Sequence, residues 1–170
     1  MNQGTKSEAL QKALKCGHPI RLDLGGAIHK QDGFFSIDRR PLPGLDLVWD
    51  LHDVPYPLPD ESVMTMLASH VWEHLFPWKM NEIMDECWRL LVPYGQLLLV
   101  MPYPGSPGHW QDPTHIKPWN ETTPHYYDPD CGHSNCQLYD IYRPRPWKIE
   151  RCEWHAVGNI EVIMAKRALR

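Results

Sequence analysis

The sequence has no apolar run long enough to cross a membrane. None of its 170 residues lie in an uninterrupted apolar stretch of about 18, and residues 1–17 lack the apolar centre of a secretory signal. The five cysteines are odd in number and irregularly spaced, which excludes the paired framework of a small secreted protein. We therefore expect a soluble, reduced, cytoplasmic protein with no membrane partner.

An excess of positive charge is also missing. The formal net charge is −4 at pH 7, so a broad non-specific surface for nucleic acid is not expected. Internal repeats and low-complexity tracts are absent, and the length suits one domain over residues 1–170. The oligomeric state stays open at this point.

The apolar segments that are present predict an α/β fold. A short helix is expected over residues 5–16, followed by four short buried strands at 20–24, 34–37, 45–49 and 63–68. Apolar residues at three-and-four spacing then predict one long amphipathic helix over residues 72–91, and the turn sequence VPYG ends it.

The C-terminal half predicts the rest of the sheet. Residues 96–101 form the most apolar strand of the sequence, and two runs at 147–157 and 159–166, joined by Gly158, predict a β-hairpin. The expected fold class is a Rossmann-like, doubly wound, mostly parallel sheet with a C-terminal antiparallel hairpin.

Residues 102–146 show no sustained periodicity and are rich in proline. A loop of this length inside a compact domain is usually functional, so residues 103–146 are predicted to form an ordered lid after the fifth strand. Its aromatic residues are expected to form the core of this lid rather than a platform for stacking bases; they are Trp110, Trp119, Tyr126 and Tyr127.

Three consecutive strand ends carry residues suited to an adenosine ligand. Gly25 and Gly26 follow the first strand and allow the backbone to approach a ligand closely, because glycine has no Cβ. Asp38, after the second strand, can accept hydrogen bonds from two ribose hydroxyls. Asp50, after the third, can accept from an adenine amino group while Leu51 packs on the ring. The alternative is tight strand–helix packing with solvated acids; we favour the ligand interpretation.

From about residue 21 to residue 166 the sequence resembles the class I S-adenosylmethionine-dependent methyltransferases. The segments that carry the resemblance are GFFSID, LPDESVMTMLASHVWEH, WRLLVPYGQLLLVMPYP and QDPTHIKPWNETTPHYYDP. It implies methyl transfer from S-adenosylmethionine to an O or N nucleophile of a small-molecule acceptor. The cofactor-binding positions that it implies are Asp23, Gly25, Gly26, Ala27, Asp38, Arg39, Asp50, Leu51, Ser69 and His70. Ala27 stands where the family commonly has glycine, which is expected to narrow this loop.

His70, Glu73 and His74 are spaced to share one face at the start of the expected long helix. Some O-methyltransferases of this fold hold a divalent metal with a similar Glu-x-x-Glu-His and a distant histidine, here His115 or His109. The alternative is a structural, hydrogen-bonded Glu–His pair that fixes the helix start, and this alternative is favoured over the metal.

A second constellation lies in GHWQDPTHIKPWNE, residues 108–121. Asp112 is expected to cap the backbone of a turn while His115 projects toward the pocket. A histidine there suits a general base, so His70 and His115 are the catalytic candidates. The acceptor is expected to contact His74, Trp110, Asp112 and His115. The alternative is that Asp112 and His115 bond each other and hold the lid in place.

Two further possibilities stay open. Cys131, His133 and Cys136 would hold zinc only with a fourth ligand from His109, His125 or Cys152, so free thiols in a turn are favoured. The competing function is a non-catalytic binding protein that keeps the fold. An NAD-linked oxidoreductase is disfavoured, because the sequence lacks a Gly-x-Gly-x-x-Gly loop and is expected to end in a hairpin.

Overall fold

The computed structural model describes residues 3–26, 30–132 and 139–168. Its strands are β1 (Ile20–Leu24), β2 (Phe35–Asp38), β3 (Leu47–Val48), β4 (Val63–Ser69), β5 (Leu91–Pro102), β6 (Trp147–Trp154) and β7 (Asn159–Lys166). The α-helices are α1 (Glu8–Lys15), α2 (Met80–Leu90), α3 (Pro107–Trp110) and α4 (Tyr139–Tyr142), and the 3₁₀ helices are η1 (Trp72–His74), η2 (Pro77–Lys79) and η3 (Thr123–Tyr127). No helix of the described ranges has the length and apolar character needed to span a bilayer.

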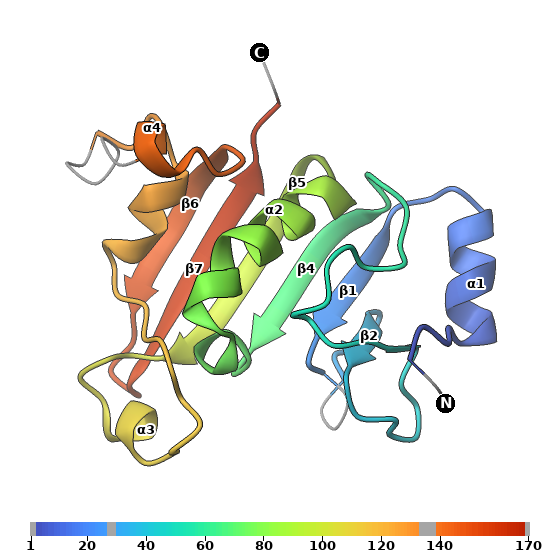
Figure 1. Ribbon diagram of the computed structural model, residues 1–170, viewed down its shortest axis with the longest axis horizontal. Coiled ribbons are helices and arrows are strands. Elements are labelled where there is room, and N and C mark those ends of the chain that lie inside the picture. Colours follow the sequence, from blue (N-terminus) through green and yellow to red (C-terminus); the bar gives the residue numbers. More distant parts are fainter. Residues whose placement is uncertain (1–2, 27–29, 133–138, 169–170) are drawn as a thin grey trace.

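The strands form one sheet in the order β3-β2-β1-β4-β5-β7-β6 (Figure 1). Strands β1 to β5 pair in parallel, whereas β7 is antiparallel to both of its neighbours, β5 and β6. The predicted mixed α/β sheet with a C-terminal antiparallel hairpin is therefore confirmed. Chain order reverses between β1 and β4, which opens a crevice at the carboxyl ends of these strands.

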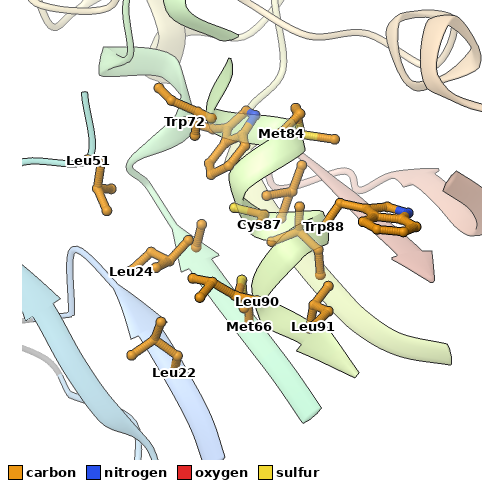
Figure 2. Close-up of a cluster of buried hydrophobic side chains, with 14 of the residues drawn as sticks. Leu22, Leu24, Leu51, Met66, Trp72, Met84, Cys87, Trp88, Leu90 and Leu91 are labelled. Carbon is orange, nitrogen blue, oxygen red and sulfur yellow. The ribbon is translucent and has the colours of Figure 1, made fainter. Parts of the chain in front are cut away.

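The two faces of the sheet are covered unequally. One register row runs across β1, β4, β5 and β7 through Leu22, Met66, Leu97 and Met164, and all four side chains are fully buried. Met66 of this row lies beside Leu90 of α2 in the buried core (Figure 2). The next row, Leu67, Leu98 and Ile163, faces away and is half-buried. The main core thus lies between the sheet and α2.

The prediction of one long helix over residues 72–91 is wrong for its first half. The segment begins as the two short 3₁₀ turns η1 and η2, and the α-helix starts only at Met80. Pro77 is the physical reason, since proline disfavours a helical residue before it and Phe76 is extended with φ −65° and ψ 126°. This break places Glu73 and His74 in a turn at the sheet edge.

Two strand boundaries also differ from expectation. The strand expected to begin at residue 96 begins at Leu91, and residues 92–95 form a bulge in it rather than a terminating turn, with Tyr94 in the left-handed region. The strand expected over residues 45–49 is reduced to Leu47–Val48.

The described parts of the segment 103–146, residues 103–132 and 139–146, pack on the sheet, and we call them the cap. Trp119 and Tyr127 are buried in it and Tyr126 is half-buried, which confirms their expected place in a core. The expectation of a buried place in the cap is wrong for Trp110, which is 75% exposed. Closure of the cap as a lid stays a prediction.

Asp46 ties three parts of the chain together. Its buried carboxylate accepts from Ser7 Oγ at 2.7 Å, Lys30 Nζ at 2.6 Å and Ser36 N at 3.0 Å. Burial alone would raise the pKa of Asp46, but these donors hold it below the usual 3.8. This stabilisation is therefore present above pH 3.8 and is lost as the pH falls through the folded-state value.

We expect Asp46→Ala to lower the free energy of unfolding by about 2–3 kcal/mol at pH 7, the scale for losing hydrogen bonds to a charged group. Urea unfolding at pH 7 and at about pH 3 measures this, and the difference from wild type should narrow at the lower pH. Asp32→Ala, on an exposed turn, is the matched control. An equal difference at both pH values would contradict the ion-pair explanation.

Candidate active site

A pocket of about 650 Å³ lies at the carboxyl edge of the sheet, where the chain order reverses. Five of the expected cofactor positions beyond the first strand line it, together with one glycine from the first loop: Gly25, Asp38, Arg39, Asp50, Leu51 and His70. These residues stand at or just after the ends of β1, β2, β3 and β4. The expectation that successive strand ends converge on one cavity therefore agrees with the structure.

Gly25 makes room for this cavity at the end of β1. Its φ is +77°, and a Cβ there would lie 2.3 Å from Val71 Cγ2, so only glycine fits. Asp23 lies beneath the same loop rather than on the pocket wall: it is 3% exposed, and a Cβ on Gly26 would meet its carboxylate. Burial raises the pKa of Asp23, although it accepts a hydrogen bond from Gln31 N. Asp23 and Gly26 thus shape the loop, and Ala27 lies outside the described residues.

Asp38 ends β2 and is held by Arg40. Asp38 Oδ1 accepts from Arg40 N at 2.8 Å and from Arg40 Nε at 3.1 Å, while Oδ2 accepts from the guanidinium at 3.0 Å. The Arg40 side chain is 52% exposed, so it can swing into solvent. A ribose that binds Asp38 through both hydroxyls would displace this guanidinium.

Asp50 is prepared to accept a hydrogen bond. Burial opposes its ionisation, but bonds from His52 N and His52 Nδ1 to Oδ1 hold the pKa of Asp50 below its usual value. Phe76 N donates to His52 Nε2 at 3.1 Å, so the proton of this imidazole is on Nδ1. The hydrogen bonds that the described residues make to this carboxylate go to Oδ1, and Leu51 lines the pocket next to Asp50.

His70 begins the loop after β4 in the left-handed region, with φ 55°. Its side chain is half-exposed, lines the pocket, and places Nδ1 3.5 Å from Glu73 Oε1. The nearby Glu73 carboxylate raises the pKa of His70. Ser69, expected beside it, is exposed and does not line the pocket.

Of the residues expected to contact the acceptor, the structure brings only His74 to the pocket wall. His115 does not project into it: the side chain is 7% exposed, and Nδ1 donates to the carbonyl oxygen of His109 at 2.8 Å. The expectation that His115 projects toward the pocket is therefore wrong. Trp110 points to solvent and donates to Pro104 O, so it is not a pocket residue either.

Asp112 behaves as the capping residue that its sequence predicts. Oδ1 accepts from Thr114 N at 2.8 Å and from Thr114 Oγ1 at 2.7 Å. Its other oxygen is 3.9 Å from His115 Nε2, which is an ion-pair distance and not a hydrogen bond. Asp112 thus fixes the turn that carries Thr114 to the pocket wall.

The structural Glu–His pair that we favoured from the sequence is not seen. Glu73 is fully buried, and neither carboxylate oxygen has a hydrogen-bond partner within the described ranges. The turn around it instead gathers histidines: the His74 and His115 ring centres are 4.7 Å apart, and those of His115 and His109 5.5 Å. Burial and the neighbouring His115 lower the pKa of His109.

The second metal hypothesis loses one of its ligands. Cys131 is disulfide-bonded, so the expected free thiol is wrong and no thiolate is available there for zinc. His133 and Cys136 lie outside the described residues.

Three polar residues of the pocket were missed by sequence reasoning, namely Arg40, His52 and Thr114. Each stands two residues after an aspartate and donates its backbone N–H to that side chain. The signal Asp-x-donor was therefore present in the sequence, because aspartate commonly bonds the backbone two residues on.

No family model and no curated protein matches this sequence. Solved structures do. An S-adenosylmethionine-dependent methyltransferase from Archaeoglobus fulgidus is similar with a TM-score of 0.58 and 18% identity over 94% of either chain. The chain has the class I methyltransferase fold. Two other structures with this fold have different acceptors in their names.

One is a 16S rRNA adenine methyltransferase from Catenulisporales acidiphilia with its cosubstrate S-adenosylmethionine, with a TM-score of 0.58 and 12% identity over 96% of this chain and 92% of that one. The other is 1,6-didemethyltoxoflavin-N1-methyltransferase from Burkholderia thailandensis with S-adenosylhomocysteine bound, with a TM-score of 0.58 and 12% identity over 95% and 79%. The class I methyltransferase fold thus serves both an RNA and a small molecule in these two proteins.

Proposed function

We propose that this protein is a cytoplasmic methyltransferase that uses S-adenosylmethionine to methylate an O or N nucleophile of a small molecule. The observation that carries the proposal is the convergence of Gly25, Asp38 and Asp50 on one pocket from three successive strand ends. A glycine for close backbone approach and two acids that accept hydrogen bonds suit an adenosine ligand at this edge.

Each residue of the pocket would have a separate role in binding the cofactor. Asp38 would accept from the two ribose hydroxyls, and Asp50 Oδ2 from the adenine amino group, while Leu51 packs on the ring. When bound, S-adenosylmethionine supplies an activated methyl group. The protein's contribution is to align an acceptor with it and to exclude water, which lowers the barrier mainly through orientation.

Of the two candidate bases, His70 and His115, only His70 lines this pocket. Its half-exposed imidazole lies where β4 ends, and it can take the proton of an acceptor hydroxyl that is a poor nucleophile. His74 and Thr114 on the same wall would contact the acceptor. The size of this pocket and the net acidic charge of the chain favour a small molecule over RNA.

One observation favours a non-catalytic binding protein as the second candidate. Both oxygens of Asp38 are engaged by Arg40, so the ribose position is already filled by a group of the protein itself. Under this alternative the pocket would not take the cofactor at all.

Calorimetric titration of the full chain with S-adenosylmethionine and S-adenosylhomocysteine distinguishes the two. We expect micromolar binding of both, followed by transfer of a labelled methyl group when pools of small molecules are supplied. Parallel incubation with RNA tests the acceptor class. No binding by the folded protein would overturn the enzyme proposal and favour the alternative.

We also expect Arg40→Ala to tighten S-adenosylmethionine binding about 3- to 5-fold. An exposed ion pair is worth up to about 1 kcal/mol, and the ligand no longer has to break it. The same titration measures the change, with Arg39→Ala, on the same wall, for comparison. Weaker binding by Arg40→Ala would show that Arg40 supports the ligand instead of competing with it.

A further inference from the structure

The buried Glu73 carboxylate needs a partner that the described residues do not supply. Glu73 lies in η1, is 0% exposed, and has no hydrogen bond to either oxygen from those residues. Two histidine nitrogens face it only at ion-pair distance: His70 Nδ1 is 3.5 Å and His115 Nε2 is 3.8 Å from Oε1. An unpaired carboxylate in such a place is strongly disfavoured, and buried groups of this kind usually have an ion or water as partner.

His115 presents a lone pair to this carboxylate. Its Nδ1 is 2.8 Å from the carbonyl oxygen of His109. A carbonyl oxygen only accepts, so Nδ1 carries the proton and Nε2 of the neutral ring carries the lone pair. A second proton on Nε2 would make an ion pair with Glu73, but 3.8 Å is too long for a hydrogen bond.

His74 is oriented in the same way. Its Nδ1 is 2.9 Å from Thr114 Oγ1 and 3.3 Å from the Thr114 carbonyl oxygen. The Thr114 hydroxyl gives its own proton to Asp112 Oδ1 at 2.7 Å, so it accepts from His74 Nδ1. The lone pair of His74 is therefore on Nε2 as well.

We infer that Glu73, His74 and His115 form a binding site for a divalent transition-metal ion of the zinc class. One ligand atom from each residue lies within 4.8 Å of the others. Bonds of about 2.1 Å to a common ion bring such atoms together with a shift of about 1 Å. Two imidazoles and a carboxylate are a donor set that suits zinc, and each imidazole gives its other nitrogen's proton to an acceptor outside the set, as metal-bound histidines do.

The site opens toward the pocket. His74 and Thr114 line the cavity, whereas Glu73 and His115 lie behind its wall. An ion held by these three residues keeps a coordination position that water or a ligand oxygen can reach from the cavity. The inference does not depend on methyl transfer, because it rests on the three side chains and their proton assignments.

The test is metal binding by the full chain after treatment with a chelator, without S-adenosylmethionine. Calorimetry with Zn²⁺ should give one site per chain, and Co²⁺ should give a visible absorption band of a low-symmetry site with nitrogen ligands. Glu73→Gln keeps the shape and removes the charge. We expect it to weaken Zn²⁺ binding at least 20-fold and to abolish the Co²⁺ band.

The matched control is the double variant Cys16→Ser/His18→Ala, which removes an exposed cysteine and histidine far from the site in sequence. It should bind Zn²⁺ like wild type. Thermal melts confirm folding, and if Glu73→Gln does not fold, His74→Ala replaces it, because its side chain is at the pocket wall. Absence of stoichiometric Zn²⁺ and Co²⁺ binding, binding unchanged in Glu73→Gln, or binding lost in the double control would each overturn the inference.

Discussion

Replacing Asp38 by alanine is expected to weaken S-adenosylmethionine binding about 100-fold, or about 2.7 kcal/mol. Under the proposed function the carboxylate accepts hydrogen bonds from two ribose hydroxyls, and a bond to a charged group is worth about 1.5–3 kcal/mol. Arg40 offsets part of this gain, since it binds both oxygens in the free protein. The net loss is therefore nearer to one such bond than to two.

Calorimetry with S-adenosylhomocysteine measures the same loss without turnover. Asp38→Asn keeps the volume and one acceptor, so it should fall between wild type and Asp38→Ala. Asp32→Ala removes an exposed acid from the connection before β2 and should bind like wild type. Unchanged affinity in a folded Asp38→Ala would move the cofactor away from this strand end and contradict the proposed site.

The parts of the site that the sequence predicted share one physical origin. Asp38 and Asp50 follow short apolar runs that parallel strands require, and parallel strands bring their carboxyl ends to one edge. A polar residue directly after a buried apolar run therefore predicts a place at this edge of the sheet. Gly25 was predicted on the same ground, because it directly follows a buried strand. The structure explains the need for glycine there: φ is +77°, and a Cβ would clash with Val71.

The direction of His115 could not be predicted in the same way. It stands in a cap without periodicity, where turn geometry decides which way each residue faces. The Asp112 turn sends Thr114 to the pocket and the next residue behind the wall. The Asp112 cap was predicted, but a reversal of direction between adjacent residues depends on backbone angles that the residue types do not specify.

For Glu73, the sequence predicted the neighbouring residues but not the local structure. Its spacing from His70 and His74 predicted a shared face on a helix, yet Pro77 breaks that helix and leaves η1 as a single turn. The residues still meet, but His115 reaches them from the cap through backbone contacts such as Ile116 N to Glu73 O at 2.7 Å. The sequence spacing therefore predicted that these residues lie together. It did not predict that the Glu73 carboxylate would lack hydrogen bonds from the described residues.

Trp119 anchors this cap, and Trp119→Ala is expected to lower the free energy of unfolding by about 3–5 kcal/mol. The indole is 1% exposed, stacks on Tyr127 with ring centres 5.7 Å apart, and meets the edge of Trp72 at 6.4 Å. Its removal leaves a cavity between the cap and the turn that carries Glu73. For a chain of this size the loss corresponds to a fall in melting temperature of roughly 10 °C.

Trp110→Ala is a control of the same residue type in the same segment. Its indole is 75% exposed, so truncation should change the unfolding free energy by less than about 0.5 kcal/mol. Urea unfolding of both variants measures the contrast. Because Trp119 packs on Trp72, next to Glu73 in η1, partial loosening of the cap in Trp119→Ala should also weaken whatever binds at the pocket wall. Equal stability of the two variants would mean that the cap is not held by its buried aromatic pair, and the pocket wall formed by Thr114 and Ile116 would then need another support.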